Sequence, residues 1–213
     1  YYAIDFTFDE IRQLKVSERF PYYNKSNPFY PNRFPLWKSQ FHLNSLEEEI
    51  ELVQGVQESM KRIYKLNENK YTQNLNSNAG IYVEIKEPEF HKRENKANFS
   101  EIVLSILNRY GYNKKTDPVI VQCFDPNELR RIRETLKSNL TLVQLLEANQ
   151  IMNNFDWTSK EGLFEISKFA DGIGPEKSQL IHYDPKSKKV NPSELYKEAK
   201  RLDDDCSREE QLL

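Results

Sequence analysis

The chain has 213 residues, which is enough for one large domain or two small ones. Its 31 basic and 33 acidic side chains leave a formal charge of −2, which excludes the strong positive field that recruits nucleic acid or anionic membranes. No stretch approaches eighteen apolar residues, so we expect no transmembrane segment, and neither Cys123 nor Cys206 stands in a metal-binding or redox motif.

The first part of the chain combines helical signals with a long irregular segment. Residues 7–15 predict a helical turn or two, with Thr7 as the N-cap. Residues 18–43 are rich in proline, asparagine and aromatic residues without helical or strand periodicity, which indicates an ordered insert such as a lid. A strong helix then begins at Ser45, which forms a capping box with Glu48. We expect this helix to bury the apolar stripe of Ile50, Val53, Val56, Met60 and Ile63.

The second part of the chain alternates strands and helices. We expect strands at 80–86, 118–124 and 140–146 and a short one within 170–177, and helices at 99–111, 125–139, 159–170 and 191–202. The charged run "KEPEFHKRENK" after the first strand has mixed signs and predicts a solvated loop. Nearly continuous apolar strands between helices indicate an α/β fold with a parallel sheet. A doubly wound sheet and a (β/α)₈ barrel both fit this pattern.

The strand in "GIYVEIKEPEF" places unusual residues on one of its faces. Ile81, Val83 and Ile85 form an apolar face, whereas Glu84 and Lys86 lie on the other face at the C-terminal end. Ligands bind beyond the C-terminal ends of strands in both α/β architectures. A carboxylate there can hold a hard cation, and a lysine can neutralise an anionic oxygen. The alternative interpretation is a Glu84–Lys86 surface pair on an edge strand.

The next strand carries Gln122 and Phe124 in the corresponding positions. Gln122 could orient a hydroxyl or a phosphate there, although a hydrogen-bonded core amide is the favoured interpretation. Cys123 lies inside the apolar run and is most simply a small core residue.

Other candidate sites are weaker. None of His42, His91 and His182 has a histidine three or four residues away, so each is expected to be structural or solvated. The stretch "DGIGPEKS" lacks the spacing of a phosphate-binding loop and predicts a strand end that turns into the next helix.

Several stretches in order carry a family resemblance: "YYAIDFTFDEIRQL", "YPNRFPLWKS", "LEEEIELVQG", "GIYVEIKEPEFH", "VQCFDPNELRRIR" and "KFADGIGPEKS". From Tyr1 to about Lys200 the chain resembles the glycerophosphodiester phosphodiesterases, specifically the bacterial periplasmic or surface-lipoprotein type. The resemblance implies a (β/α)₈ TIM barrel, incomplete in this chain, that occupies residues 1–203. Residues 18–43 would then be an insertion near the active-site mouth, and residues 204–213 a polar tail that is a frayed helix or disordered.

The resemblance also implies an activity and roles for individual residues. Such enzymes hydrolyse small glycerophosphodiesters to glycerol 3-phosphate and an alcohol, with two histidines as general acid and base. They use a divalent cation, for which we favour Ca²⁺ over Mg²⁺, held by three carboxylates. By motif, Glu84 is one metal ligand, Lys86 faces the phosphate, and Gln122 and Phe124 line the pocket, with Cys123 in place of the commoner serine. A periplasmic or cell-surface location is implied by the resemblance as well.

The chain departs from the family pattern at both ends. The family's "HRG", "ExD" and "HD" motifs, which carry both histidines and two of the carboxylates, are expected upstream of Tyr1 and are not in this sequence. Two further strands expected after the last helix are replaced by "RLDDDCSREEQLL". We therefore expect a piece of a phosphodiesterase that is inactive alone. The alternative is a truncated, non-catalytic barrel remnant that acts as a surface or binding protein.

Overall fold

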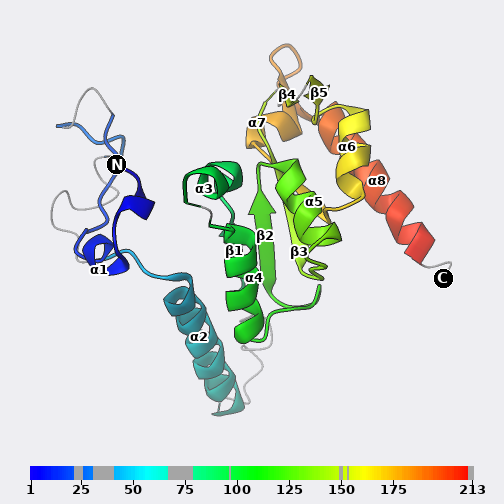
Figure 1. Cartoon of the computed structure of the whole chain (residues 1–213). Helices are drawn as coiled ribbons and strands as arrows, with labels where there is room; N and C mark the ends of the chain where they lie inside the picture. Colours follow the sequence, from blue (N-terminus) through cyan, green and yellow to red (C-terminus); the bar gives the residue numbers. More distant parts are fainter. Residues whose placement is uncertain are drawn as a thin grey trace. The chain divides into compact units, whose positions relative to one another are not determined.

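Two compact units make up the chain, Tyr1–Glu58 and Ser59–Leu213. Figure 1 draws the helices and strands in sequence colours. The structure is a computed structural model that describes residues 1–21, 26–30, 41–66, 79–95, 97–148, 151–152 and 154–210. The first unit contains η1 (Ala3–Asp5), α1 (Phe8–Ile11) and the beginning of α2 (Leu46–Leu66), which continues into the second unit.

Local capping decides where the helices of the first unit begin, as the sequence predicts. Thr7 caps α1: its Oγ1 accepts a hydrogen bond from the Glu10 backbone N–H at 3.3 Å, and Glu10 accepts one from the Thr7 N–H at 2.7 Å. Ser45 and Glu48 form the same reciprocal pair before α2. These contacts satisfy backbone N–H groups that a helix start otherwise leaves unpaired.

The insert predicted at 18–43 forms no helix or strand in its described part, and residues 22–25 and 31–40 lie outside the described residues. Its two ends lie together, because Lys15 and His42 form an isolated antiparallel bridge. The Val16 N–H donates to the Phe41 carbonyl at 2.9 Å in this bridge. The insert therefore begins and ends at one place in its unit.

The apolar stripe of α2 is only partly buried, so the prediction for this stripe is wrong at one position. Ile50 is fully buried, but Val56 is 47% exposed. Val53 and Met60 are partly covered, and the side chain of Ile63 lies outside the described part. Helix periodicity shows which side chains share a face, but only packing partners bury that face.

The second unit contains the predicted alternation of strands and helices. Its elements are β1 (Ile81–Glu84), α3 (Pro88–Asn95), α4 (Phe99–Arg109), β2 (Val119–Cys123), α5 (Pro126–Glu134), β3 (Thr141–Leu146), β4 (Ile151–Met152), β5 (Phe155–Asp156), α6 (Lys160–Ser167), β6 (Gly172–Pro175), α7 (Lys177–Leu180), β7 (Ile181–Asp184), β8 (Lys189–Pro192) and α8 (Glu194–Glu210).

Four strands form one parallel sheet in the order β1-β2-β3-β6. These four strands follow one another across the sheet in the same order as in the sequence, without the reversal of order that marks a doubly wound sheet. This progression is that of a (β/α)₈ barrel. The described strands do not close it, so the sheet is the incomplete barrel that the sequence predicts.

The two faces of this sheet differ in burial. One face is packed against helices, and α5 contacts both β2 and β3; Figure 1 shows α4 and α5 on the same side of the sheet. The buried side chains of this face come mainly from alternate positions of β2 and β3 and from α4, α5 and α6 (Val119, Val121, Cys123, Leu142, Leu146, Leu107, Leu129, Ile132, Leu163 and Ile166). The other face carries Tyr82, Glu84 and Gln122, which are exposed or half-buried.

The open face is concave. In a flat sheet β1 and β6 would lie about 14 Å apart, three strand spacings of about 4.8 Å. Yet a Cβ atom placed on Gly174 of β6 would lie only 3.8 Å from the hydroxyl of Tyr82 on β1. The sheet therefore curls toward this face, as a barrel wall does. The same Cβ would lie 2.8 Å from Leu145 Cδ2, so a larger residue at position 174 would require the Leu145 side chain to shift.

Two predictions about connecting segments need correction. The run predicted as a solvated loop forms α3, because Pro88 opens the helix, Glu89 lies in its first turn and Lys92 and Arg93 lie in its last. The segment after β6 forms an unpredicted antiparallel hairpin of β7 and β8. The last helix, α8, continues to Glu210, so the backbone of the predicted tail at 204–210 is helical.

Candidate functional site

Two of the predicted site residues lie side by side at the end of the parallel sheet. Glu84, the last residue of β1, pairs in register with Gln122 of β2. The next backbone contact continues the ladder, because the Ile85 N–H donates to the Gln122 carbonyl at 2.9 Å. Parallel pairing therefore brings together two positions that are far apart in the sequence.

A pocket of about 540 Å³ lies beyond the ends of β1, β2 and β3. It is lined by Glu84, Lys86 and Phe124, but Gln122 lies outside it. The remaining lining residues include four acidic side chains and several apolar ones (Glu87, Glu89, Asp125, Glu147, Ile85, Pro88, Cys123, Ala148, Ile151 and Met152). Three of the four predicted site residues thus line one pocket. The fourth, Gln122, lies outside it but next to Glu84 on the neighbouring strand.

The charges of Glu84 and Lys86 have no partner among the residues that the structure describes. Both side chains are exposed, and neither makes a hydrogen bond or an ion pair with any residue that the structure describes. β1 is indeed an edge strand of the sheet, but the surface ion pair between these two residues is not formed. Both groups are therefore available to a ligand. The sheet face that they occupy is open among the described residues.

Cys123 lies on the opposite, helix-covered face, as expected for a core residue, and is 1% exposed. Its thiol donates to the Ile85 carbonyl at 3.0 Å, and its Sγ accepts from the Asp125 N–H at 3.3 Å. Burial raises the pKa of the thiol to about 12, so it stays protonated and unreactive at neutral pH. Cys123 lines the pocket, but its thiol is held in these two contacts and ties the end of β1 to the end of β2.

Gln144 of β3 is a second tie between strand ends that sequence reasoning did not single out. It is fully buried, and its Nε2 donates to the carbonyl oxygens of Cys123, Phe124 and Leu145 at 3.2, 2.9 and 3.0 Å. Its Oε1 has no hydrogen-bond partner among the described residues. A glutamine inside an apolar strand is the signal that could have identified this role.

The described residues do not form a complete metal site by themselves. Glu84 offers the hard oxygen ligand that Ca²⁺ or Mg²⁺ prefers, but these cations need about six oxygen ligands or more. No group of three or more histidine, cysteine or acidic side chains in the described part of the chain is placed to hold a metal ion. Glu84 therefore offers one ligand for a cation and not the complete set of ligands.

The three histidines have no arrangement for metal binding or catalysis in this part of the chain. His42 contacts the Arg12 carbonyl through Nδ1 at 2.8 Å, and the ring of His91 lies 3.9 Å from that of Phe99. His182 is exposed on β7. That these histidines are structural or solvated stays a prediction.

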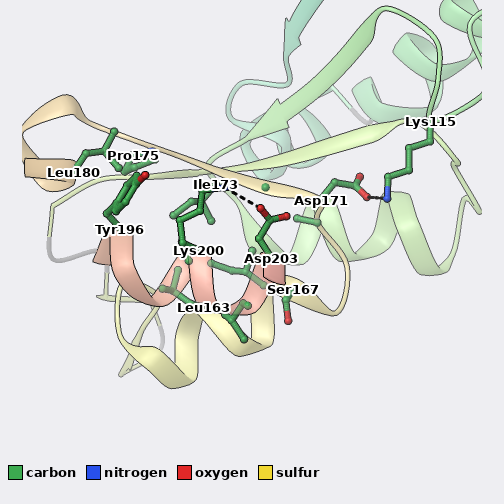
Figure 2. A pocket seen from close by; sticks show the side chains of 15 residues that line it. Lys115, Leu163, Ser167, Asp171, Ile173, Pro175, Leu180, Tyr196, Lys200 and Asp203 are labelled. Carbon is green, nitrogen blue, oxygen red and sulfur yellow. Dashed lines mark hydrogen bonds and ion pairs between the residues drawn. The ribbon is translucent and has the colours of Figure 1, made fainter. Parts of the chain in front are cut away.

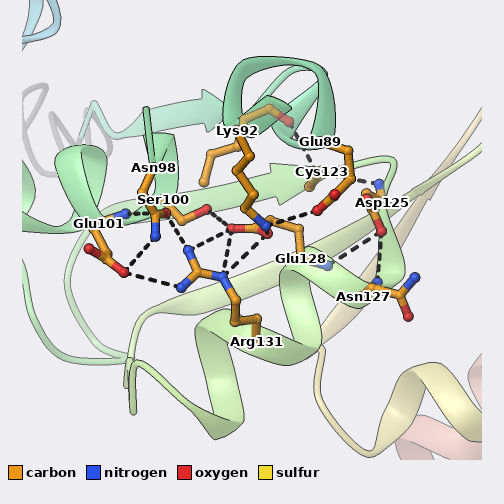
Figure 3. A network of polar contacts seen from close by, with 11 residues as sticks. Glu89, Lys92, Asn98, Ser100, Glu101, Cys123, Asp125, Asn127, Glu128 and Arg131 are labelled. Carbon is orange, nitrogen blue, oxygen red and sulfur yellow. Dashed lines mark hydrogen bonds and ion pairs between the residues drawn. The ribbon is translucent and has the colours of Figure 1, made fainter. Parts of the chain in front are cut away.

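A buried polar network lies on the helix-covered side, next to the pocket (Figure 3). Its centre is Glu128 of α5, whose side chain is 1% exposed. The carboxylate accepts hydrogen bonds from Lys92 of α3 at 2.5 Å, from Arg131 at 3.1 Å and from the Ser100 hydroxyl. Burial alone would raise the pKa of Glu128, but the bonds from Lys92, Ser100 and Arg131 hold it below its ordinary value. In the sequence, Glu128 is only one of several charged residues within the helix predicted at 125–139.

A second hollow of about 620 Å³ lies at the other edge of the sheet, between β6, α6 and α8 (Figure 2). Its lining is largely apolar and includes Leu163, Ile173 and Tyr196. The acidic residue Asp171 precedes β6 and is paired with Lys115 at 3.1 Å and with Arg133 at 2.7 Å. It thus lies at the N-terminal end of the strand, where barrels keep their stabilising contacts rather than their chemistry.

None of the helices in the described part of the chain combines the length and the apolar character that crossing a bilayer requires.

Comparisons with known proteins agree with the arrangement of the sheet. A sequence model of the glycerophosphoryl diester phosphodiesterase family matches residues 2–168. A protein of Haemophilus influenzae named glycerophosphodiester phosphodiesterase is 39% identical over 201 residues, which cover 85% of this chain and 51% of that protein. A protein of the same name from Treponema pallidum is 34% identical over 200 residues, covering 85% and 52%. The chain spans about half the length of the curated relatives it matches.

Proposed function

Because the chain belongs to the glycerophosphoryl diester phosphodiesterase family, we propose that the protein of which it forms part hydrolyses glycerophosphodiesters to glycerol 3-phosphate and an alcohol. The proposal concerns the whole protein, since this chain matches about half of each curated relative. Its substrate is a small molecule. A periplasmic or cell-surface location is part of the proposal and rests on the resemblance to the exported type.

One observation carries the proposal: the carboxylate of Glu84 and the ammonium of Lys86 lie without described partners in a pocket at the C-terminal ends of parallel strands. Active sites of (β/α)₈ enzymes lie at this end of the barrel. A phosphodiester is an anion, and Lys86 supplies a positive charge to its phosphate oxygens. Phe124, 39% exposed, provides an apolar wall in the same pocket.

In this proposal each residue has a distinct role. Glu84 is one oxygen ligand of a divalent cation, with Ca²⁺ preferred to Mg²⁺. Such a cation, when bound, neutralises charge on the phosphate oxygens. Lys86 binds a phosphate oxygen, and Gln122, beside Glu84 in the sheet, orients the substrate through its amide. The proposal requires further cation ligands and the acid and base groups from outside the described residues.

The test is hydrolysis of glycerophosphocholine by the full-length natural protein and its Glu84→Gln variant. We expect glycerol 3-phosphate release to need a divalent cation and to stop on chelation. Glu84→Gln removes one ligand of the cation. A resulting loss of about 3 kcal/mol of transition-state stabilisation should slow turnover roughly 100-fold. The stability should not change, because the Glu84 side chain is exposed.

Glu134→Gln is the matched control, because this carboxylate is 54% exposed and its contact with Arg130 is 4.0 Å long. It should keep full activity. A full-length protein that releases no glycerol 3-phosphate with any divalent cation would contradict the proposal and favour a non-catalytic binding protein.

A further inference from the structure

The turn that carries Lys86 has a conformation that needs support. Lys86 is the second residue after the end of β1, and Glu87 after it has a φ of 49°, in the left-handed region. A residue with a Cβ rarely adopts this conformation, and it persists where surrounding contacts hold it. Pro88, which is buried, then opens α3. The position of Lys86 is therefore coupled to the position of α3.

Helix α3 contacts both α5 and α4 through its side chains. Lys92 reaches from α3 to Glu128 of α5, with 2.5 Å between Nζ and Oε2. The residues are 36 positions apart in the sequence, so this contact belongs to the tertiary structure. On the same helix the ring of His91 lies against Phe99 of α4. Figure 3 shows Lys92 pointing toward the buried carboxylate.

The partners of Glu128 fall into two groups. Lys92 links α5 to α3, whereas Arg131 lies on the same helix as Glu128, three residues away. Ser100, fully buried, links Glu128 to α4. Loss of Lys92 therefore removes the contact between Glu128 and α3 and leaves the carboxylate two other partners. Loss of Arg131 leaves the contact with α3 in place.

We propose that the Glu128–Lys92 pair is a positioning device for the phosphate-binding end of the pocket. It fixes α3, and α3 through the turn at Glu87 fixes Lys86. Glu128 and Lys92 touch no substrate in this arrangement and act through Lys86. The inference rests on the proposed function, because Lys86 is assigned to the phosphate there.

The experiment compares Lys92→Met and Arg131→Met in the full-length protein, each alone and combined with Lys86→Ala. Displacement of a binding group by about 1 Å can cost a factor of 10 to 100 in rate. We therefore expect Lys92→Met to lower kcat/KM for glycerophosphocholine about tenfold, mainly through KM. Arg131→Met should lower the thermal midpoint at least as much and leave kcat/KM nearly unchanged.

The double variants separate positioning from general destabilisation. If Lys92 acts through Lys86, then Lys92→Met should cause no further loss of kcat/KM in the Lys86→Ala background, while its effect on the thermal midpoint remains. An equal loss of kcat/KM in both backgrounds, or a loss from Arg131→Met as large as that from Lys92→Met, would overturn the inference and leave the proposed function standing.

A second readout does not depend on activity. Amide hydrogen exchange of residues 85–95 should speed up in Lys92→Met and stay at the wild-type rate in Arg131→Met. If the wild-type protein hydrolyses no glycerophosphodiester, the proposed function fails, and this exchange pattern still decides whether the pair holds the turn. An unchanged amide exchange rate of residues 85–95 in Lys92→Met would overturn the inference that the Glu128–Lys92 pair fixes α3.

Discussion

Two neighbouring groups of charged side chains in this molecule differ in burial and in pairing. On the helix-covered side of the sheet, Glu128 is 1% exposed and its carboxylate is bonded to Lys92, Arg131 and Ser100. At the strand ends, Glu84 and Lys86 are exposed and make no described contact with each other or with other side chains.

The contrast shows how burial and pairing separate structural charges from charges free to bind a ligand. A buried ion needs partners, because its loss of hydration costs several kcal/mol or more. The network around Glu128 provides them and joins α3, α4 and α5. An exposed charge costs little without a partner, so the folding of the chain does not require Glu84 or Lys86. Their position beyond parallel strands is what supports the proposal that they bind a ligand.

The largest effect is expected from Glu128→Ala. It removes the centre of the network and leaves Lys92, Arg131 and Ser100 without their shared acceptor. The free energy of unfolding should fall by about 3 kcal/mol or more. Urea denaturation measures it, with Glu134→Ala on the same helix as the control, for which a change below about 0.5 kcal/mol is expected. Similar losses in the two variants would remove the distinction between buried and exposed charges.

A change at the strand ends should give the reverse pattern. Lys86→Ala in the full-length protein should slow hydrolysis about tenfold or more, since it removes a charged contact to the phosphate. The free energy of unfolding should stay within about 0.5 kcal/mol of the wild-type value. Lys168→Ala, which removes an exposed partner of Glu165, should change neither quantity much. Equal losses of activity and stability in Lys86→Ala would make Lys86 structural.

The smallest effect is a difference in pH dependence. The bonds to Glu128 lower its pKa in the folded protein below the ordinary value of 4.5. Its contribution to stability is therefore present above pH 4.5 and is lost as the pH falls through the folded-state pKa. Glu128→Gln should be less stable than wild type at pH 7, and the gap should narrow in acid. Urea midpoints at pH 7 and at pH 3 measure the gap, and a constant gap would contradict the assignment.

Much of the fold could be predicted because its signals are local. The alternation of Ile81, Val83 and Ile85 predicted β1, and the caps at Thr7 and Asp125 set the starts of α1 and α5. Each of these patterns involves residues within a few positions of one another. The same alternation also separated Glu84 from the apolar face and placed it in phase with Tyr82, and the structure agrees.

Other features depend on contacts between distant residues, so no local pattern could reveal them. Helix α3 lacks an apolar stripe, and its charged run predicted a loop. Its attachment comes from Lys92 to Glu128 and from His91 to Phe99. The burial of Glu128, which the sequence places on an ordinary helix start, likewise depends on α3 and α4 packing over it. Surface charges and buried charges look alike in a sequence, because burial is a property of the packed elements.

The sequence by itself determined the parallel α/β alternation, the strand-end position of Glu84 and Lys86, and the family resemblance that names their roles. Only the tertiary structure decided that β1 is an edge strand, that the sheet curls until Tyr82 approaches Gly174, and that Glu84 and Lys86 remain unpaired among the described residues. The physical reason is range. Periodicity and capping act within a turn or two of the chain, whereas curvature, burial and charge pairing arise only when segments far apart in the sequence are packed together.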